Sequence, residues 1–157
     1  MEEIVDTLVA VLISWISVNF GLPESEVTPQ VAFVPEVEMI ETRLASATSA
    51  EQIHAIEVTN PRGRPDYGIY AIYSDETSTV YLQEDWSAQS PADVSILVHE
   101  LVHHMQNQAN LDYECPEMSE KLAYRAQRRW LHDFGINLES EFNLDPMTVL
   151  VRTNCWQ

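Results

Sequence analysis

Residues 90–108 constrain the fold of this chain more than any other stretch of the sequence. Ser90 is a preferred helix N-cap residue, Pro91 suits the first helical position, and Asp93 lies three residues after the cap, as in a capping box. Apolar residues then recur every three to four positions, as on one face of a helix: Val94, Leu97, Val98, Leu101, Val102 and Met105. The stretch therefore predicts a helix that ends near Gln108 and packs one face into a hydrophobic core.

The same helix carries the pattern His99-Glu100-x-x-His103. Residues four apart lie one turn from each other on the same helical face, so both imidazole rings can reach one tetrahedral Zn2+. Glu100 is turned from His99 by about 100°, where it can act as a general base on a water molecule at the metal. The alternative is an ordinary core helix with an accidental match, but Leu101 and Val102 at the variable positions favour the metal-binding interpretation.

A catalytic zinc site takes three protein ligands and leaves a position open for water. The class that draws the third ligand from HExxHxxGxxH is excluded, because Gln106 and Ala109 stand where glycine and histidine are needed. The other common solution is a glutamate on a later helix, and residues 116–133 predict such a helix. Glu120 lies deep within it, and Glu117, one turn earlier, is the rival ligand. On the alternative interpretation both are ordinary solvated acids.

The order of these elements resembles the gluzincin zinc metallopeptidases, in which HExxH is followed by a glutamate on a later helix. That glutamate stands in an E-x-x-A-(D/Y) setting, matched here by Glu120, Ala123 and Tyr124. Residues 4–135 also resemble a bacterial family of unknown function whose members look like minimal gluzincins. The resemblance implies one α+β domain over residues 1–157, with a compact zincin-like core, N-terminal helices, a small β-sheet or hairpin, an active-site helix and a glutamate helix.

The resemblance also implies roles for individual residues. It makes His99, His103 and Glu120 the zinc ligands, and Glu100 the general base. Many gluzincins carry an acid four residues after the ligand glutamate, where it orients a ligand histidine, but Tyr124 stands in that place here. A phenol is not the usual anionic partner, so we expect the basicity of the ligand histidine to be tuned differently.

We expect the protein to hydrolyse peptide bonds in a peptide or protein substrate. Bound zinc lowers the pKa of its water toward about 7, and Glu100 accepts the proton and later passes it to the leaving amine. The developing oxyanion needs a further hydrogen-bond donor. The sequence leaves several candidates open: Tyr73, Tyr81, Tyr113, Tyr124, His104, Arg62 and Arg64. His104 is turned from His103 by about 100°, which predicts a solvent-facing or second-layer residue and not a ligand.

Short β-rich runs precede the HExxH helix. The sequence predicts a strand over Val31–Pro35, a helix over Glu36–Ala47, a loop over Asn60–Gly68, and a β-hairpin formed by Ile69–Tyr73 and Thr79–Gln83. The second run of the hairpin continues as "TVYLQEDW", residues 79–86, and we expect an edge strand over the cleft. A peptide substrate would extend the sheet by pairing with this edge.

The N-terminal segment Ile4–Phe20 is strongly apolar but contains Asp6 and Asn19. It is shorter than the roughly 20 apolar residues of a membrane span and lacks the basic start of a signal peptide. We expect a buried helix without stable membrane insertion, whose buried stripe is Ile4, Leu8, Val11, Trp15 and Val18. The localisation stays open: extracytoplasmic (periplasmic or secreted) if a signal peptide has been removed, and otherwise cytoplasmic.

A net charge of −17, from 8 basic and 25 acidic residues, argues against nucleic acid and anionic membranes as partners, because both need clustered Lys and Arg. It allows a basic substrate, although a solubilising acidic surface is the simpler explanation. The oligomeric state stays open. The alternative to a peptidase is a zinc-binding regulatory or interaction module without turnover, and Glu100 argues against it because metal binding alone does not need that residue.

The two cysteines, Cys115 and Cys155, allow three interpretations. In an exported protein they would form a disulfide that closes a loop of about 40 residues, a stabilisation of roughly 3–4 kcal/mol on the chain-entropy estimate. In a cytosolic protein they would be free thiols. In the third interpretation, Cys155 is a thiolate ligand that caps the zinc as a latency switch.

Overall fold

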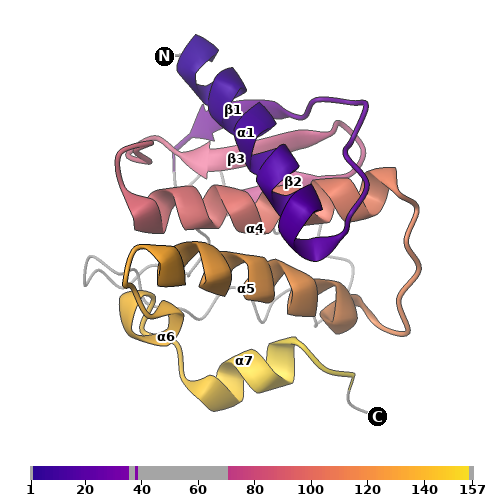
Figure 1. Ribbon diagram of the computed structural model, residues 1–157, viewed down its shortest axis with the longest axis vertical. Helices are drawn as coiled ribbons and strands as arrows, with labels where there is room; N and C mark the ends of the chain where they lie inside the picture. The colour runs from indigo at the N-terminus through magenta and orange to yellow at the C-terminus, as the bar shows by residue number, and fades with distance from the viewer. Residues whose placement is uncertain (1, 36–37, 39–70, 156–157) are drawn as a thin grey trace.

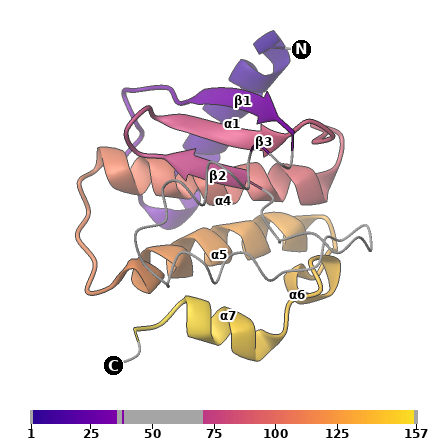
Figure 2. The ribbon, with the colours of Figure 1, turned by 180° about the vertical axis from the view of Figure 1, so that it is seen from behind.

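The computed structural model describes residues 2–35, 38 and 71–155, which form a mixed α+β fold and so confirm the predicted fold class. The elements in chain order are α1 (Glu2–Phe20), β1 (Gln30–Val34), β2 (Ala71–Ser74), β3 (Thr79–Gln83), α4 (Pro91–Gln108), α5 (Pro116–Asp133), α6 (Leu138–Glu141) and α7 (Pro146–Arg152). Figures 1 and 2 show the sheet on one side of α4 and α5 on the other, with α6 and α7 beyond α5. The predicted loop over residues 60–68, and the predicted helix over residues 36–47 apart from Glu38, lie outside the described residues.

The sheet has the strand order β1-β3-β2, in which β1 is parallel and β2 antiparallel to β3. The predicted hairpin is confirmed, since β2 and β3 pair across a turn that brings Ser74 opposite Thr79. The prediction that residues 79–86 form an edge strand is wrong, because β1 pairs with β3 on the side that β2 leaves free. Val80 and Leu82 are fully buried, which suits a central strand. Both edges of β3 are thus hydrogen-bonded within the sheet, and a substrate cannot pair with this strand.

The helix α1 packs against α4, and it buries a different face from the predicted one. Its buried residues are Val5, Val9, Leu12, Ile13 and Ile16. In the predicted stripe, Ile4, Val11 and Val18 are 63%, 58% and 83% exposed, so the prediction is wrong for these three residues. The other two, Leu8 and Trp15, are half-buried and pack against the core. Both sets recur at helical spacing because α1 is apolar nearly all round, and spacing alone does not choose between them. Gly21, at φ +74°, ends the helix in the left-handed conformation that glycine adopts readily.

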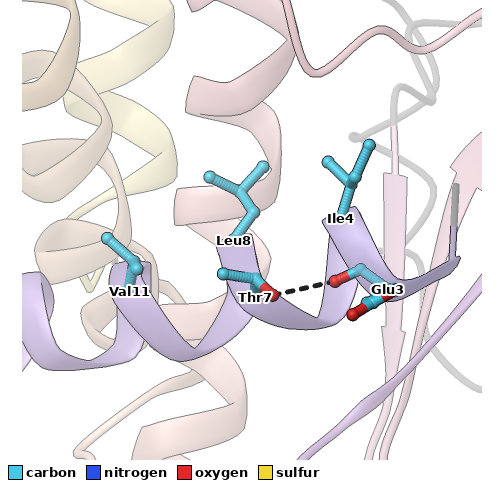
Figure 3. A pocket seen from close by; sticks show the side chains of 5 residues that line it. All are labelled: Glu3, Ile4, Thr7, Leu8 and Val11. Atoms are coloured by element: carbon cyan, nitrogen blue, oxygen red, sulfur yellow. Dashed lines mark hydrogen bonds between the residues drawn. The ribbon is translucent and has the colours of Figure 1, made fainter.

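The outward face of α1 is apolar as well. Figure 3 shows the side chains of Ile4, Leu8 and Val11 on this face, where they line a surface pocket together with Glu3 and Thr7. Among the described residues, α1 alone has the length and apolar composition of a membrane-crossing helix, properties that buried core helices and signal sequences share. The absence of membrane insertion therefore stays a prediction.

The helix α4 is central to the packing, since α1, β2, β3 and α5 all contact it. The predicted core face of α4 is confirmed, because all six of its members are buried: Val94, Leu97, Val98, Leu101, Val102 and Met105. On α5, the small residues Ala123 and Ala126 are fully buried. Trp15 of α1 meets Trp130 of α5 edge to face, with ring centroids 5.4 Å apart. The three helices thus share one core, and α4 presents His99 and His103 to α5.

Candidate metal centre

The N-terminus of α4 is fixed by local hydrogen bonds that set the rotation of the whole helix. The hydroxyl of Ser90 accepts a hydrogen bond from the backbone N–H of Asp93 at 3.2 Å, as the capping pattern predicts. The carboxylate of Asp93 in turn accepts from the backbone N–H of Ser87 at 2.9 Å, and the indole N–H of Trp86 donates to the carbonyl of Asp93 at 2.6 Å. This anchoring holds residues 99 and 103 toward α5.

Two histidines of α4 and one glutamate of α5 converge. The Nε2 atom of His99 lies 2.9 Å from Oε2 of Glu120, and the Nε2 atom of His103 lies 3.1 Å from Oε1 of the same carboxylate. The potential ligand atoms of His99, His103 and Glu120, called here the metal-binding group, all lie within 4.8 Å of one another, close enough for one metal ion. Their side chains are 12%, 17% and 36% exposed for His99, His103 and Glu120. Glu117, the rival ligand in the sequence, is not part of this group.

The second ring nitrogen of His99 is held by an amide of α5. Nδ1 of His99 lies 2.9 Å from the amide oxygen of Gln127. The orientation of the Gln127 amide follows from its neighbours. The Ser95 hydroxyl donates its hydrogen to the carbonyl of Ala92, because a carbonyl oxygen only accepts. The hydroxyl oxygen of Ser95 therefore accepts from the NH2 group of Gln127 at 3.2 Å. The oxygen of Gln127 therefore faces His99, and Nδ1 of His99 must carry the hydrogen.

The second ring nitrogen of His103 is held in the same way. Nδ1 of His103 lies 3.1 Å from the amide oxygen of Gln106. The NH2 group of Gln106 donates to the backbone carbonyl of Ser119 at 3.0 Å, which fixes the amide because a carbonyl oxygen only accepts. Nδ1 of His103 is therefore a donor too.

These two amides make the cluster fit for a metal. Because the hydrogen of each imidazole is held on Nδ1, a neutral ring keeps its lone pair on Nε2, the atom that faces Glu120. Two imidazole nitrogens and a carboxylate form a common protein donor set for catalytic zinc. Many gluzincins orient a ligand histidine with an acid, whereas both orienting groups here are neutral amides.

Neither orienting amide was predicted from the sequence, although the position of each carries a signal. Gln127 lies seven residues after Glu120, on the same helical face. Gln106 lies three residues after His103, where the HExxHxxGxxH pattern would have glycine. Both residues are buried, which is unusual for glutamine and indicates a specific partner.

The charges of the cluster are strongly coupled. Burial lowers the pKa of His103, but the carboxylate of Glu120, helped by Glu100 and a hydrogen bond to Gln106, outweighs burial and raises that pKa to about 9. Burial likewise raises the pKa of Glu120, but His103 and His99 outweigh it and bring the pKa well below its ordinary value. The carboxylate is thus ionised, and His103 holds a proton that a metal cation would replace.

Glu100 lies beside the cluster but outside it. Its side chain is half-buried, and it forms no hydrogen bond or ion pair with any residue that the structure describes. Its charge acts on both His103 and Tyr124, which places it within electrostatic reach of these two residues. A carboxylate in this position can accept a proton from a water molecule between it and the cluster.

Tyr124 packs against the cluster. Its ring meets that of His99 edge to face, with centroids 4.7 Å apart, and Nη1 of Arg152 donates to its phenol oxygen at 3.4 Å. Burial raises the pKa of Tyr124, with a smaller contribution from Glu120, so the phenol keeps its hydrogen at neutral pH. A neutral phenol at this place is a hydrogen-bond donor for an oxygen that gains negative charge.

The other candidate donors either have a different place in the fold or lie outside the described residues. The phenol of Tyr73 is bonded to His104, Tyr81 lies half-buried on the central strand β3, and Tyr113 is 37% exposed in the loop between α4 and α5. Arg62 and Arg64 lie outside the described residues. Tyr124, by contrast, packs its ring directly against His99 of the metal-binding group.

His104 is fully buried, so of the two predicted positions, solvent-facing or second-layer, the solvent-facing one is wrong. Its Nε2 lies 2.7 Å from the carbonyl oxygen of Val27, and its Nδ1 lies 2.8 Å from the phenol oxygen of Tyr73. Since the carbonyl only accepts, Nε2 carries the hydrogen and Nδ1 accepts from Tyr73. Burial lowers the pKa of His104 and keeps it neutral. The ring therefore connects α4 to β2 and to the segment before β1, and it is not a ligand.

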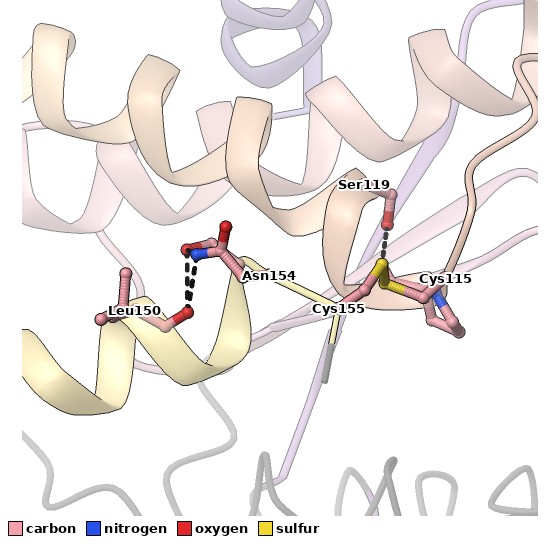
Figure 4. The surroundings of a disulfide bond; sticks show 7 residues. Cys115, Ser119, Leu150, Asn154 and Cys155 are labelled. Carbon is pink, nitrogen blue, oxygen red and sulfur yellow. Dashed lines mark hydrogen bonds between the residues drawn. A yellow bond between two sulfur atoms is a disulfide. The ribbon is translucent and has the colours of Figure 1, made fainter. Parts of the chain in front are cut away.

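Cys115 and Cys155 form a disulfide, with Cα atoms 5.8 Å apart and a sequence separation of 40 residues. Figure 4 shows this bond at the start of α5, beside the end of the C-terminal segment. Cys115 is the N-cap residue of α5, the helix that carries Glu120. The interpretation of Cys155 as a zinc ligand is excluded here, because its sulfur is bonded to Cys115 and it does not belong to the metal-binding group.

Comparisons with known proteins place the chain in a family. A search of curated proteins and a search of solved structures each find no match. The profile of a family described as "Domain of unknown function (DUF6647)" matches residues 2–157, which include every residue of the metal-binding group and both cysteines. The chain therefore belongs to the DUF6647 family.

Proposed function

We propose that the protein is a zinc-dependent metallopeptidase of the gluzincin type, acting on a peptide or protein substrate. The observation that carries the proposal is the convergence of two imidazole Nε2 atoms and one carboxylate within 4.8 Å, with both imidazoles on a helix that also carries Glu100, whose carboxylate has no hydrogen bond or ion pair among the described residues. An accidental HExxH on a core helix would not need a glutamate on another helix between its two rings. It would not need an oriented amide behind each ring either.

Zinc fits this donor set better than harder cations. Two histidines and one carboxylate are the ligands of many catalytic zinc sites, whereas Mg2+ and Ca2+ prefer all-oxygen sites. We infer that His99, His103 and Glu120 hold the ion. When bound, zinc would lower the pKa of water to about 7 and polarise a carbonyl group.

The residues around the cluster would have separate roles in the hydrolysis of the peptide bond. Glu100 accepts the proton of the attacking water and delivers it to the leaving amine, for which its carboxylate has no competing partner among the described residues. The phenol of Tyr124 donates a hydrogen bond to the carbonyl oxygen as this atom gains negative charge. Gln127 and Gln106 keep the ligand rings in the required tautomer and orientation.

The disulfide supports an extracytoplasmic location for this activity. Disulfides persist in secreted and periplasmic proteins and are rare in the cytosol, where thiols are kept reduced. The bond between Cys115 and Cys155 secures the start of the helix that carries Glu120. An oxidising compartment would therefore keep the third ligand in place.

The experiment that tests the proposal is digestion of a peptide library by the zinc-loaded wild type and by Glu100→Gln. The amide cannot accept the proton of water, so the variant should retain zinc and fold but lose nearly all cleavage. Glu117→Gln is the matched control, because Glu117 is an acid outside the metal-binding group, and it should cleave like the wild type. Zinc binding by wild type and Glu100→Gln with cleavage by neither would instead support a binding module without turnover.

A further inference from the structure

The C-terminal segment packs against the helix that supplies the third ligand. The helix α7 contacts α5, and Val149 of α7 and its C-cap residue Thr153 are both buried. The hydroxyl of Thr153 donates to the carbonyl of Val149 at 2.8 Å, and the side-chain amide of Asn154 donates to the carbonyl of Leu150 at 2.9 Å. Figure 4 shows Leu150 and Asn154 at the end of α7. These bonds cap the C-terminal end of α7, and the contact between α7 and α5 places that end beside the ligand-bearing helix.

In this position, α7 places the cationic side chain of Arg152 beside Tyr124. Arg152, the last residue of α7, is half-buried, and its Nη1 lies 3.4 Å from the phenol oxygen of Tyr124. A guanidinium group only donates hydrogen bonds, so the phenol oxygen must act as the acceptor in this contact. The hydrogen of the phenol is then left for another acceptor. The ring of Tyr124 lies edge to face with that of His99, with centroids 4.7 Å apart, which places the phenol on the side of α5 that faces the cluster.

The disulfide secures both partners of this contact. Cys155 follows Arg152 by three residues, and Cys115 precedes Tyr124 by nine on the same helix that carries Glu120. The bond joins the segment that follows α7, a helix of 7 residues, directly to the N-cap residue of α5. The covalent link therefore limits how far Arg152 can move from Tyr124.

We propose that the C-terminal segment is part of the catalytic apparatus, in which Arg152 is a positioning residue for Tyr124 and the Cys115–Cys155 bond keeps it in place. The inference rests on the proposed peptidase function. In this role Arg152 accepts none of the reaction's protons and is not one of the metal ligands. It holds the phenol oxygen so that the phenol hydrogen points toward the substrate oxygen.

The test is a double-mutant cycle on kcat and KM of the zinc-loaded protein, with a peptide selected from the library. Loss of one oxyanion donor lowers kcat about 100- to 1000-fold, so Tyr124→Phe should fall in that range with KM little changed. Arg152→Met should lower kcat by roughly 10- to 100-fold in the wild type and by much less in the Tyr124→Phe background, because it acts through the phenol. Arg152→Lys should recover part of the loss.

Two controls separate this role from a structural one. Arg125→Met removes an exposed arginine next to Tyr124 in sequence and should leave kcat unchanged. The double variant Cys115→Ser/Cys155→Ser should reproduce the fall in kcat seen for Arg152→Met while zinc content stays equal. An equal fall in kcat on Arg152→Met in both backgrounds, or an unchanged kcat in the disulfide variant, would overturn the proposal.

A readout independent of activity distinguishes this inference from the function on which it rests. In protein with 13Cζ-labelled tyrosine, the resonance of Tyr124, assigned by its loss in Tyr124→Phe, should move on Arg152→Met and on removal of the disulfide, but not on Arg125→Met. A resonance that does not move shows that Arg152 does not hold the phenol and overturns the inference. A resonance that moves in a protein that cleaves no peptide refutes the peptidase function and, with it, the catalytic role of the contact.

Discussion

Zinc binding is expected to displace a proton from His103, which makes the affinity for zinc depend on pH. In the metal-free protein, burial lowers the pKa of His103, but the neighbouring carboxylate of Glu120 outweighs it and raises the pKa to about 9. A coordinated imidazole has no hydrogen on its ligating nitrogen, so this proton must leave. Below about pH 9, each unit of pH therefore changes the apparent dissociation constant about tenfold, or about 1.4 kcal/mol, for this one proton. We expect zinc to bind at least about tenfold more tightly at pH 8 than at pH 7.

The assay is calorimetric titration of metal-free protein with zinc, in two buffers of equal pH but different ionisation enthalpies. The difference in observed binding enthalpy between the two buffers gives the number of protons released per zinc. Competition with a chelator gives the dissociation constant. Glu120→Gln removes the charge that raises the pKa of His103, so it should release fewer protons at pH 8 although it binds zinc more weakly. A dissociation constant that is the same at pH 7 and pH 8, with no proton released, would refute ligation of zinc by a protonated His103.

Three further predictions follow from the same geometry. Gln127→Met and Gln106→Met remove the amide oxygens that orient the ligand rings, and each should weaken zinc binding about 10- to 100-fold by chelator competition. Burial lowers the pKa of His104, so the unfolded chain takes up the proton at a higher pH than the folded one. Urea unfolding at several pH values gives the free energy of unfolding of the zinc-loaded wild type and of His104→Gln. The difference between the two should be greatest above about pH 6.5 and should fall below it. Replacing Cys115 and Cys155 by serine should lower the free energy of unfolding by roughly 3–4 kcal/mol, and an unchanged value would contradict the stabilising role of the bond.

Local signals in the sequence were sufficient to predict the two helices of the metal-binding group. The predicted boundaries of the HExxH helix and of the glutamate helix agree with α4 and α5, because a proline at the first helical position marks the start of each. Within α4, the spacing of four residues was enough to place His99 and His103 on one face. The position of Glu120 between the two rings depends on how α5 packs on α4, and the small Ala123 indicated only that a close approach was possible.

Features that depend on distant parts of the chain were predicted wrongly or missed. The central position of β3 results from its pairing with β1, about 50 residues earlier, and no property of residues 79–86 alone reveals that neighbour. The buried face of α1 depends on which side meets α4, and a helix that is apolar on both sides carries no signal for the choice. The orienting roles of Gln127 and Gln106 depend on their hydrogen bonds to Ser95 and Ser119, and these contacts arise only when α4 packs against α5.

The measurement that tests the central claim most directly is the zinc content of protein purified without added metal. The account predicts one zinc per chain in the wild type and in Glu117→Ala, and a strong loss at limiting metal in His99→Ala and Glu120→Ala. Glu100→Gln should keep the full complement, since its carboxylate lies outside the metal-binding group. A wild type that contains no zinc and takes up none, or a His99→Ala variant that retains full stoichiometry, would contradict it.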